Sequence, residues 1–222
     1  MTADDALHGD DALRADLERG RHRRGTHEFM SLANLNDGLF AIVLTLLVFD
    51  IELADPPLTD ARQLLDVVPQ LLAFAVSFAV IGRLWLLHHR FIAALGSVRG
   101  ELIVLNLAKL GLIALMPFVT SLLFVSPHVS GVLVYLGLLA LIEVLHITLM
   151  VRARARGHYR VVLSGRGFAF VLLDYAAWIA VVLLGMGVAF LWPLGGLVAL
   201  ALAIPVQALL SRFAPREAAV LG

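Results

Sequence analysis

The sequence predicts an all-α integral membrane protein with six transmembrane helices. Six apolar stretches each approach the roughly 20 residues that cross a bilayer core of about 30 Å. The stretches are apolar nearly all round, whereas the helices of a water-soluble domain keep a polar face at helical spacing. The mean hydropathy of the chain, +0.91, agrees with this assignment. The predicted spans are residues 32–53, 64–87, 102–125, 131–151, 168–191 and 193–210.

The residues between these stretches indicate where each span ends. The first span follows a charged leader, and the second closes at Trp85 and His88, where aromatic and cationic side chains mark a membrane interface. An uncharged connection, residues 126–130, separates the third span from the fourth. A polar linker, residues 152–167, precedes the fifth span, and a turn at Trp192-Pro193 divides the fifth span from the sixth.

The arginines are distributed unequally between the connections, and this predicts the orientation of the helices. Short loops rich in Lys and Arg remain in the cytoplasm. The opposite side has only Arg62, among three aspartates. We therefore predict a multi-pass protein of the cell membrane with both termini in the cytoplasm. The arginines on the predicted cytoplasmic side are Arg14, Arg19, Arg21, Arg23, Arg24, Arg90, Arg99, Arg152, Arg154, Arg156, Arg160, Arg166, Arg212 and Arg216.

The chain divides into a charged N-terminal segment (1–28), a six-helix domain (29–213) and a short C-terminal tail (214–222). The N-terminal segment alternates acidic and basic residues and has no apolar core of signal-peptide length. Its composition favours a solvated, partly helical tail over a regulatory or partner-binding segment.

The chain lacks the residues on which several kinds of chemistry depend. It has no cysteine, which excludes disulfides, thiolate metal sites and thiol catalysis. It has no Gly-rich nucleotide loop or Gly-x-Ser-x-Gly elbow. Aromatic and basic residues are not interleaved as a nucleic-acid surface requires. We therefore predict that the protein is not an enzyme and has no cofactor and no nucleic-acid partner.

Ionisable residues inside the spans lie at similar predicted depths. At about 1.5 Å per residue, they fall roughly 8 to 13 Å inside the cytoplasmic boundary, and a charge in hydrocarbon usually faces a partner, a cavity or a pathway. This layer is either an interhelical ion-pair network, which is favoured, or a proton or cation relay. Glu143-x-x-His146 has the spacing of di-metal proteins, but those need a second such motif, so no metal site is predicted. The polar network comprises Asp37, Arg83, His88, His89, Asn106, Lys109, Glu143, His146 and Asp174.

Three ordered blocks of sequence resemble a known family. Residues 37–51, Asp-Gly-Leu-Phe-Ala-Ile-Val-Leu-Thr-Leu-Leu-Val-Phe-Asp-Ile, resemble the first helix of the transmembrane protein 175 family of potassium channels, in its bacterial single-repeat form. The block from Ser77-Phe78 through Trp85, His88, His89 and Phe91 resembles the second helix of that family. Leu105-Asn106 with Met116-Pro117-Phe118-Val119-Thr120 resembles the third.

The chain departs from this family at the start of the first helix. Members typically carry Arg-x-x-x-Phe-Ser-Asp there, whereas this chain reads Ser31-Leu32-Ala33-Asn34-Leu35-Asn36-Asp37. The Asp is kept, while the Arg and Ser that normally tie helix 1 to its neighbours are absent. We expect the cations of Lys109 and Arg83 to substitute for them by balancing Asp37.

The resemblance implies that helix 1 of each subunit lines a pore. Gly38, Ile42, Thr45 and Phe49 recur at i+3 and i+4 and so form one stripe. By position in the motif, Ile42 matches the family's apolar constriction, which gates by dewetting, and Thr45 matches its hydroxyl layer. Packing against other helices is the alternative for such ordinary membrane residues.

The resemblance also implies the function, a passive, weakly selective potassium channel. The family assembles four single-repeat subunits, so a homotetramer in the lipid bilayer with potassium ions as its ligand is expected. No Thr-Val-Gly-Tyr-Gly carbonyl filter is present, so the preference for potassium should be modest. The alternatives are a proton-coupled carrier or membrane enzyme that uses the charged layer within one subunit, and a non-conducting relic of the family.

Overall fold

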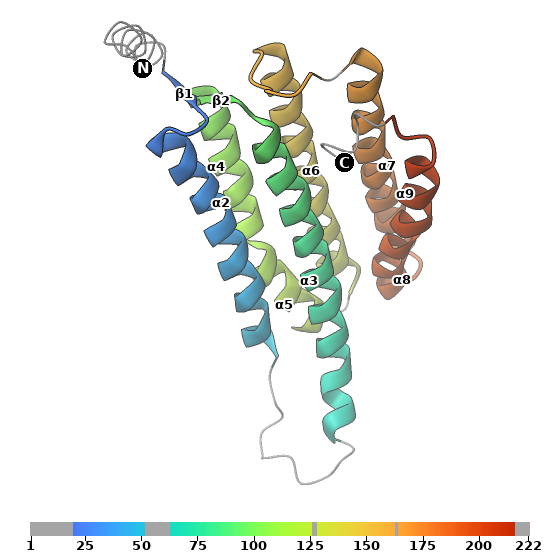
Figure 1. Ribbon diagram of the computed structural model, residues 1–222. Helices are drawn as coiled ribbons and strands as arrows, with labels where there is room; N and C mark the ends of the chain where they lie inside the picture. The colour runs from blue at the N-terminus through green and yellow to red at the C-terminus, as the bar shows by residue number, and fades with distance from the viewer. Residues whose placement is uncertain (1–19, 52–62, 126–127, 163, 216–222) are drawn as a thin grey trace, which may run out of the picture.

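Six helical stretches, each long and apolar enough to cross a membrane, form the described part of the protein. The computed structural model describes residues 20–51, 63–125, 128–162 and 164–215. The stretches run side by side along one common direction (Figure 1). The predicted fold class, an all-α membrane protein with six transmembrane helices, is confirmed.

The spans begin and end close to the predicted limits, but three of them consist of more than one helical segment. The first begins at His27 rather than at residue 32, and the third is broken at Leu115. The first three spans are α2 (His27–Leu46) with its 3-10 extension η1 (Leu47–Asp50), α3 (Gln63–Ala94), and α4 (Gly100–Ala114) with α5 (Met116–Val125). The last three are α6 (Val129–Ala155), α7 (Gly165–Ala189), and α8 (Pro193–Val198), η2 (Ala199–Leu202) and α9 (Ala203–Ser211).

Local sequence explains several of these limits. Thr26 precedes α2 and Ser164 precedes α7, and each side-chain oxygen accepts a hydrogen bond from a backbone N–H in the first turn. Such caps are favoured because they satisfy one of the free N–H groups at a helix start. Pro117 in the first turn of α5 and Pro193 at the start of α8 occupy positions where the missing N–H costs no helical bond.

The fifth and sixth spans approach each other at two glycines. A Cβ atom on Gly185 of α7 would lie 2.6 Å from the carbonyl oxygen of Gly196 of α8. A Cβ atom on Gly196 would lie 2.7 Å from the carbonyl oxygen of Gly185. Small residues allow membrane helices to approach this closely, and a larger side chain at either position would force the helices apart.

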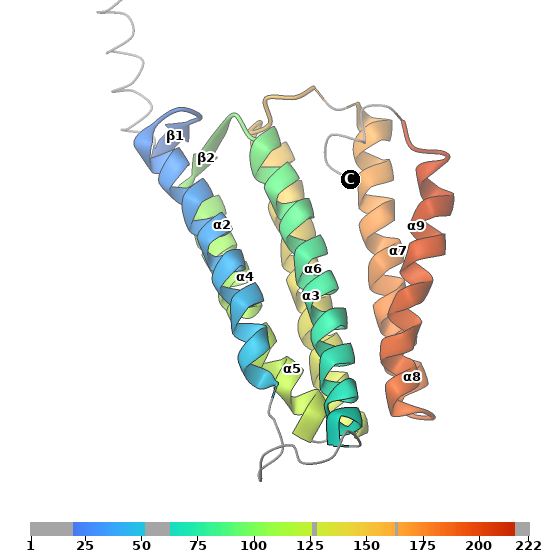
Figure 2. The same ribbon diagram turned by 60° about the horizontal axis from the view of Figure 1, so that its bottom comes forward.

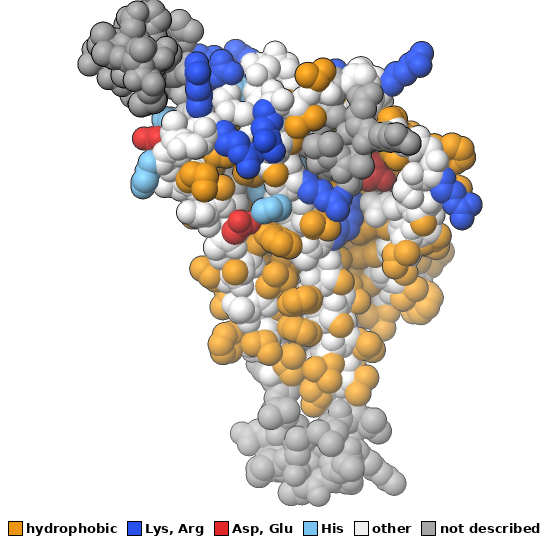
Figure 3. Space-filling model, viewed as in Figure 1, with side chains coloured by type: hydrophobic (Ala, Val, Ile, Leu, Met, Phe, Trp, Pro, Cys, Tyr) orange, Lys and Arg blue, Asp and Glu red, His pale blue; other side chains and the backbone are white. Residues whose placement is uncertain are grey.

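A short antiparallel pair of strands closes one end of the bundle. β1 (Arg21–Arg23) pairs with β2 (Ser97–Arg99), with Arg21 opposite Arg99. Three residues carry too little periodicity for sequence analysis to predict such strands. The end that carries these strands and the α6–α7 connection is named the basic end, because Arg side chains gather there in the space-filling view (Figure 3).

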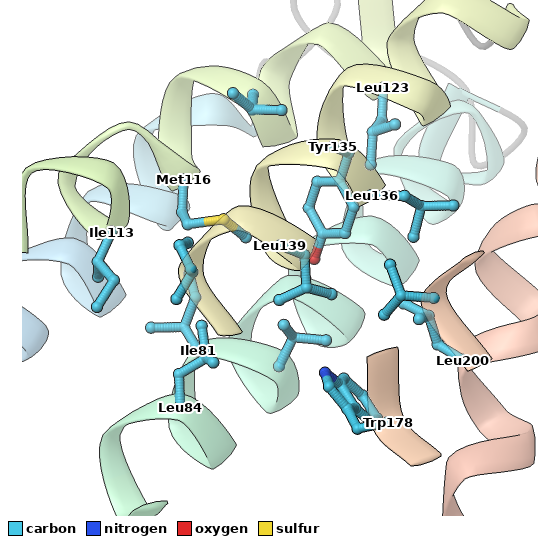
Figure 4. Packing of buried hydrophobic residues seen from close by; sticks show 14 of the residues in the cluster. Ile81, Leu84, Ile113, Met116, Leu123, Tyr135, Leu136, Leu139, Trp178 and Leu200 are labelled. Atoms are coloured by element: carbon cyan, nitrogen blue, oxygen red, sulfur yellow. The ribbon is translucent and has the colours of Figure 1, made fainter. Parts of the chain in front are cut away.

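The apolar core lies between the helices in two clusters. In the larger one, Ile81 of α3, Ile113 of α4 and Leu139 of α6 are completely buried and meet in the middle of the bundle (Figure 4). The second cluster, nearer the basic end, contains Phe91, Leu95, Met150 and Phe168. In both ribbon views α2 and the α7–α9 group lie on opposite sides of α3 and α6, so α2 is an edge helix (Figures 1 and 2).

Candidate functional site

The predicted stripe on α2 faces away from the other helices of the chain. Ile42 is 60% exposed and Phe49 is 78% exposed. Gly38 and Thr45 are exposed as well. Because α2 lies at the edge of the bundle, this stripe is open to a neighbouring surface (Figures 1 and 2). The residues that attach the opposite face of α2 to the core are Phe40, Val43 and Leu47.

Thr45 places an oxygen atom on this stripe. Its hydroxyl group donates a hydrogen bond of 2.8 Å to the carbonyl oxygen of Ile42, one turn earlier. A hydroxyl has one donor and two acceptor lone pairs, so this bond uses the proton and leaves lone pairs as acceptors. An exposed oxygen of this kind can replace part of the hydration shell of a cation.

A buried ion pair joins α3 to α6 within the predicted polar layer. Arg83 Nη1 lies 2.8 Å from Glu143 Oε1, and the Glu143 side chain is only 1% exposed. The Arg83 guanidinium also stacks over the Trp178 ring of α7, with Cζ 4.0 Å from the ring centroid. A carboxylate enclosed this far needs a cation, because a buried unpaired charge is strongly destabilising. The pair therefore holds three helices in a fixed relation.

A second buried cluster is centred on Lys109, which is the single lysine of the chain. Lys109 Nζ lies 3.0 Å from His88 Nδ1 and 2.6 Å from His146 Nδ1, and His146 Nε2 lies 3.0 Å from the Tyr175 hydroxyl. An ammonium group has three donors and no acceptor, so a charged Lys109 requires both imidazole nitrogens as acceptors. These four fully buried side chains join α3, α4, α6 and α7.

Two residues in the middle of α2 attach this helix to its neighbours. Asn36 is buried and accepts a hydrogen bond of 2.8 Å from Asn106 of α4. Asp37 accepts one of 2.9 Å from Trp85 Nε1 of α3, and His89 Nδ1 lies 3.6 Å from the same carboxylate oxygen. Asn36 thus makes an interhelical contact at the position where the family has Ser.

The expectation that Lys109 and Arg83 balance Asp37 is not met. Lys109 contacts the two histidines and Arg83 contacts Glu143, while Asp37 is bonded to Trp85 at the half-exposed surface of α2 and α3. Charge alone suggested the pairing, but the direction in which each side chain leaves its helix decides it. Asp37 needs no buried cation because 49% of its side chain is exposed.

Among the described residues, the direct contacts of the predicted layer fall into three groups, one around Arg83 and Glu143, one around Lys109 and one around Asp37. Asp174 lines, together with Arg83, a pocket of about 410 Å³ between α3, α7 and α9, and so lies beside the pair of Arg83 and Glu143. Sequence reasoning missed Asn36, Tyr175 and Trp178, because neutral polar and aromatic residues are common in membrane helices. Among the described residues, no group of three or more His, Asp and Glu side chains is arranged to hold a metal ion.

Sequence comparisons connect the first three spans to known channels. Residues 31–117 match the family model described as Endosomal/lysosomal potassium channel TMEM175. A potassium channel of Streptomyces collinus is 39% identical over 90 residues, which are 40% of this chain and 44% of the relative. A potassium channel of Chamaesiphon minutus is 35% identical over 92 residues, which are 40% of this chain and 45% of the relative. The match spans less than half the length of each relative.

Structure comparison extends the likeness beyond these spans. The crystal structure of a lysosomal potassium-selective channel TMEM175 homolog from Chamaesiphon minutus superposes with a TM-score of 0.70 at 23% sequence identity. The superposition covers 83% of this chain and 99% of that chain, so the two proteins share the six-span fold. Together, these matches confirm that the chain resembles the TMEM175 family in the sequence of its first three spans and in its fold.

Proposed function

We propose that the chain is one subunit of a passive, weakly selective potassium channel in the cell membrane. The observation that carries this proposal is the stripe of Gly38, Ile42, Thr45 and Phe49, which faces outward on an edge helix. The stripe lies within the stretch that matches proteins named potassium channels. In the proposed homotetramer, α2 of each copy surrounds a central pore, and the basic end faces the cytoplasm.

The geometry of the stripe supports different roles for Ile42 and Thr45 along the pore. A ring of Ile42 side chains offers no polar atom in exchange for the water around a cation, so it forms a constriction that closes by dewetting. A ring of Thr45 hydroxyl oxygens lies one turn further along the helix. These oxygens are fewer and less fixed than the carbonyls of a backbone filter, and the preference for potassium is accordingly modest.

Flux of potassium and sodium into liposomes that contain the purified protein tests this proposal. The Ile42→Asn substitution should wet the constriction and raise cation flux about tenfold, which corresponds to a barrier lower by about 1.4 kcal/mol. It should also weaken discrimination against sodium. The mass of the oligomer in detergent should correspond to four chains.

A matched variant separates pore lining from a general effect of a polar residue in lipid. Leu183 is 54% exposed, like Ile42, but belongs to α7, and α7 and α2 lie on opposite sides of α3 and α6 (Figures 1 and 2). Leu183→Asn should leave flux unchanged. If Ile42→Asn assembles normally and conducts as the unmodified protein does, Ile42 does not line the path.

A crevice next to the Lys109 cluster favours a second candidate, the proton-coupled carrier. This crevice of about 230 Å³ between α2 and α3 is lined in part by Asp37, His88 and His89. It therefore gives access to Lys109 through His88. A carrier would work as a single subunit and lose proton-coupled transport in Lys109→Met, whereas the channel would keep potassium flux in every Lys109→Met tetramer that still assembles.

A further inference from the structure

A pocket at the basic end collects cationic side chains from three segments of the chain. It has a volume of about 190 Å³ and is lined by Arg21 of β1, Arg99 of β2, and Arg156 and His158 after α6. A pocket of about 260 Å³ shares Arg99, Arg156 and His158 and extends to the first residues of α4. Neither pocket includes a residue of the α2 stripe or of the buried polar clusters.

The fold holds two of these arginines face to face. Arg21 and Arg99 are directly opposite each other on paired antiparallel strands, a position in which like charges repel. Arg21 Nε donates a hydrogen bond of 3.0 Å to Ser97 Oγ, which in turn lies 3.0 Å from His158 Nδ1. That bond uses one of the five N–H donors of the Arg21 guanidinium. The pairing of the strands therefore holds these two arginines next to each other.

Among the described residues that line the two pockets, arginines outnumber carboxylates. Glu101 supplies the carboxylate among the described lining residues, and it is engaged by Arg152 as well as by Arg156, whose Nη2 lies 3.5 Å from Glu101 Oε2. His158 lies at the floor and is almost completely buried. Burial lowers the pKa of His158, and the nearby charges of Arg21, Arg99 and Arg156 lower it further.

We propose that this pocket binds a phosphate group, carried by the headgroup of an anionic membrane lipid or by a soluble phosphorylated compound. A phosphomonoester carries a charge of about −1.5 to −2 at pH 7, which offsets the repulsion between Arg21 and Arg99. The planar forks of guanidinium groups match phosphate oxygens in pairs. The adjoining start of α4, a helix of 15 residues, adds the positive end of its dipole. The pocket lies where α4 begins and α6 ends, at the basic end of the bundle.

Two measurements on the full chain in detergent distinguish the sources of the phosphate. Native mass spectrometry compares the binding of phosphatidic acid with that of phosphatidylcholine, and thermal unfolding is followed during titration with inorganic phosphate at constant ionic strength. Binding of phosphatidic acid at least about tenfold tighter than of phosphatidylcholine supports a lipid ligand. Stabilisation by inorganic phosphate without a lipid preference supports a soluble ligand. The absence of both responses would overturn the proposal.

Single substitutions test whether phosphate binding depends on the arginines that line the pocket. Arg99→Gln and Arg156→Gln should each weaken binding about tenfold, since each removes one charged donor. Arg156 lies outside the strands, so its replacement leaves the pairing of β1 with β2 intact even if Arg99→Gln disturbs it. Arg166→Gln is the matched control, because Arg166 is an exposed arginine at the start of α7 that lines neither pocket. An equal loss in Arg166→Gln would show a diffuse surface attraction and would contradict a defined site.

Discussion

The stripe on α2 and the clusters inside the bundle differ in the burial and charge of their polar side chains. The stripe is exposed and uncharged, with the Thr45 hydroxyl as its polar side chain. The clusters contain Arg83, Glu143 and Lys109, whose partners come from the same chain. The groups that a bilayer tolerates least are thus enclosed where they hold helices together, while the surface proposed for ions carries apolar groups and dipoles. Stability and conduction should therefore depend on different residues.

The largest effect that tests this separation should come from Arg83→Met. This change leaves Glu143 buried without a cation, and we expect it to lower the free energy of unfolding by about 3–5 kcal/mol. Chemical unfolding in detergent measures the loss, and adding Glu143→Gln should restore most of it because the two residues act as a pair. Potassium flux per assembled tetramer should not change.

The exposed pair of Arg152 and Glu101 is the matched control for that experiment. Its side chains are 52% and 39% exposed. Arg152→Met should therefore cost under about 1 kcal/mol, as is usual for surface ion pairs. Equal losses of unfolding free energy for Arg83→Met and Arg152→Met would show that burial of the Arg83–Glu143 pair does not make its loss more costly.

Lys109→Met should have the next largest effect, about 2–4 kcal/mol of unfolding free energy. It removes the donor shared by His88 and His146, and a buried polar group that loses its partner costs about 1–3 kcal/mol. Double-mutant cycles sharpen the assignment: Lys109 should couple to His146 by more than about 0.5 kcal/mol and be additive with Asp37. Coupling to Asp37 alone would contradict the contacts described here.

The smallest effect should come from Thr45→Ala, and it should appear in selectivity rather than in stability. Loss of the hydroxyl oxygens should reduce the potassium-to-sodium flux ratio about two- to fivefold, equivalent to about 0.4–1 kcal/mol. Thr45→Ser keeps the oxygen and should keep the ratio. If the potassium-to-sodium flux ratio is the same in the Ala and Ser variants, the Thr45 hydroxyl does not line the ion path.

The spans were predictable from the sequence because length and hydrophobicity alone define them. The strands β1 and β2 and the break at Leu115 were not, since three-residue strands and helix breaks carry little periodic signal. The stripe on α2 followed from helical spacing, but its exposure did not. The opposite stripe, with Phe40 and Val43, is equally apolar, and only the packed structure shows which stripe the bundle buries.

The members of the polar layer were predictable from their rarity in membrane spans, but their partners were not. Position along a helix gives the depth of Lys109 and Asp37, while the direction around the helix axis decides whether they meet. Lys109 points into the bundle and Asp37 toward its half-exposed edge. Tyr175 and Asn36 carried no charge to attract attention, although each completes a buried hydrogen bond.

The ion pair between Arg83 and Glu143 also bears on how the chain is made. The two residues are 60 positions apart and belong to the second and fourth spans, so Arg83 leaves the ribosome well before its partner. An Arg inside a span raises the free energy of insertion, by up to about 2.5–3.5 kcal/mol when it lies at the centre. We expect a chain that stops after residue 125 to insert α3 poorly, and Arg83→Leu to correct this in a protease-protection assay. That result would show that Arg83 delays the insertion of the second span until the fourth has been synthesised.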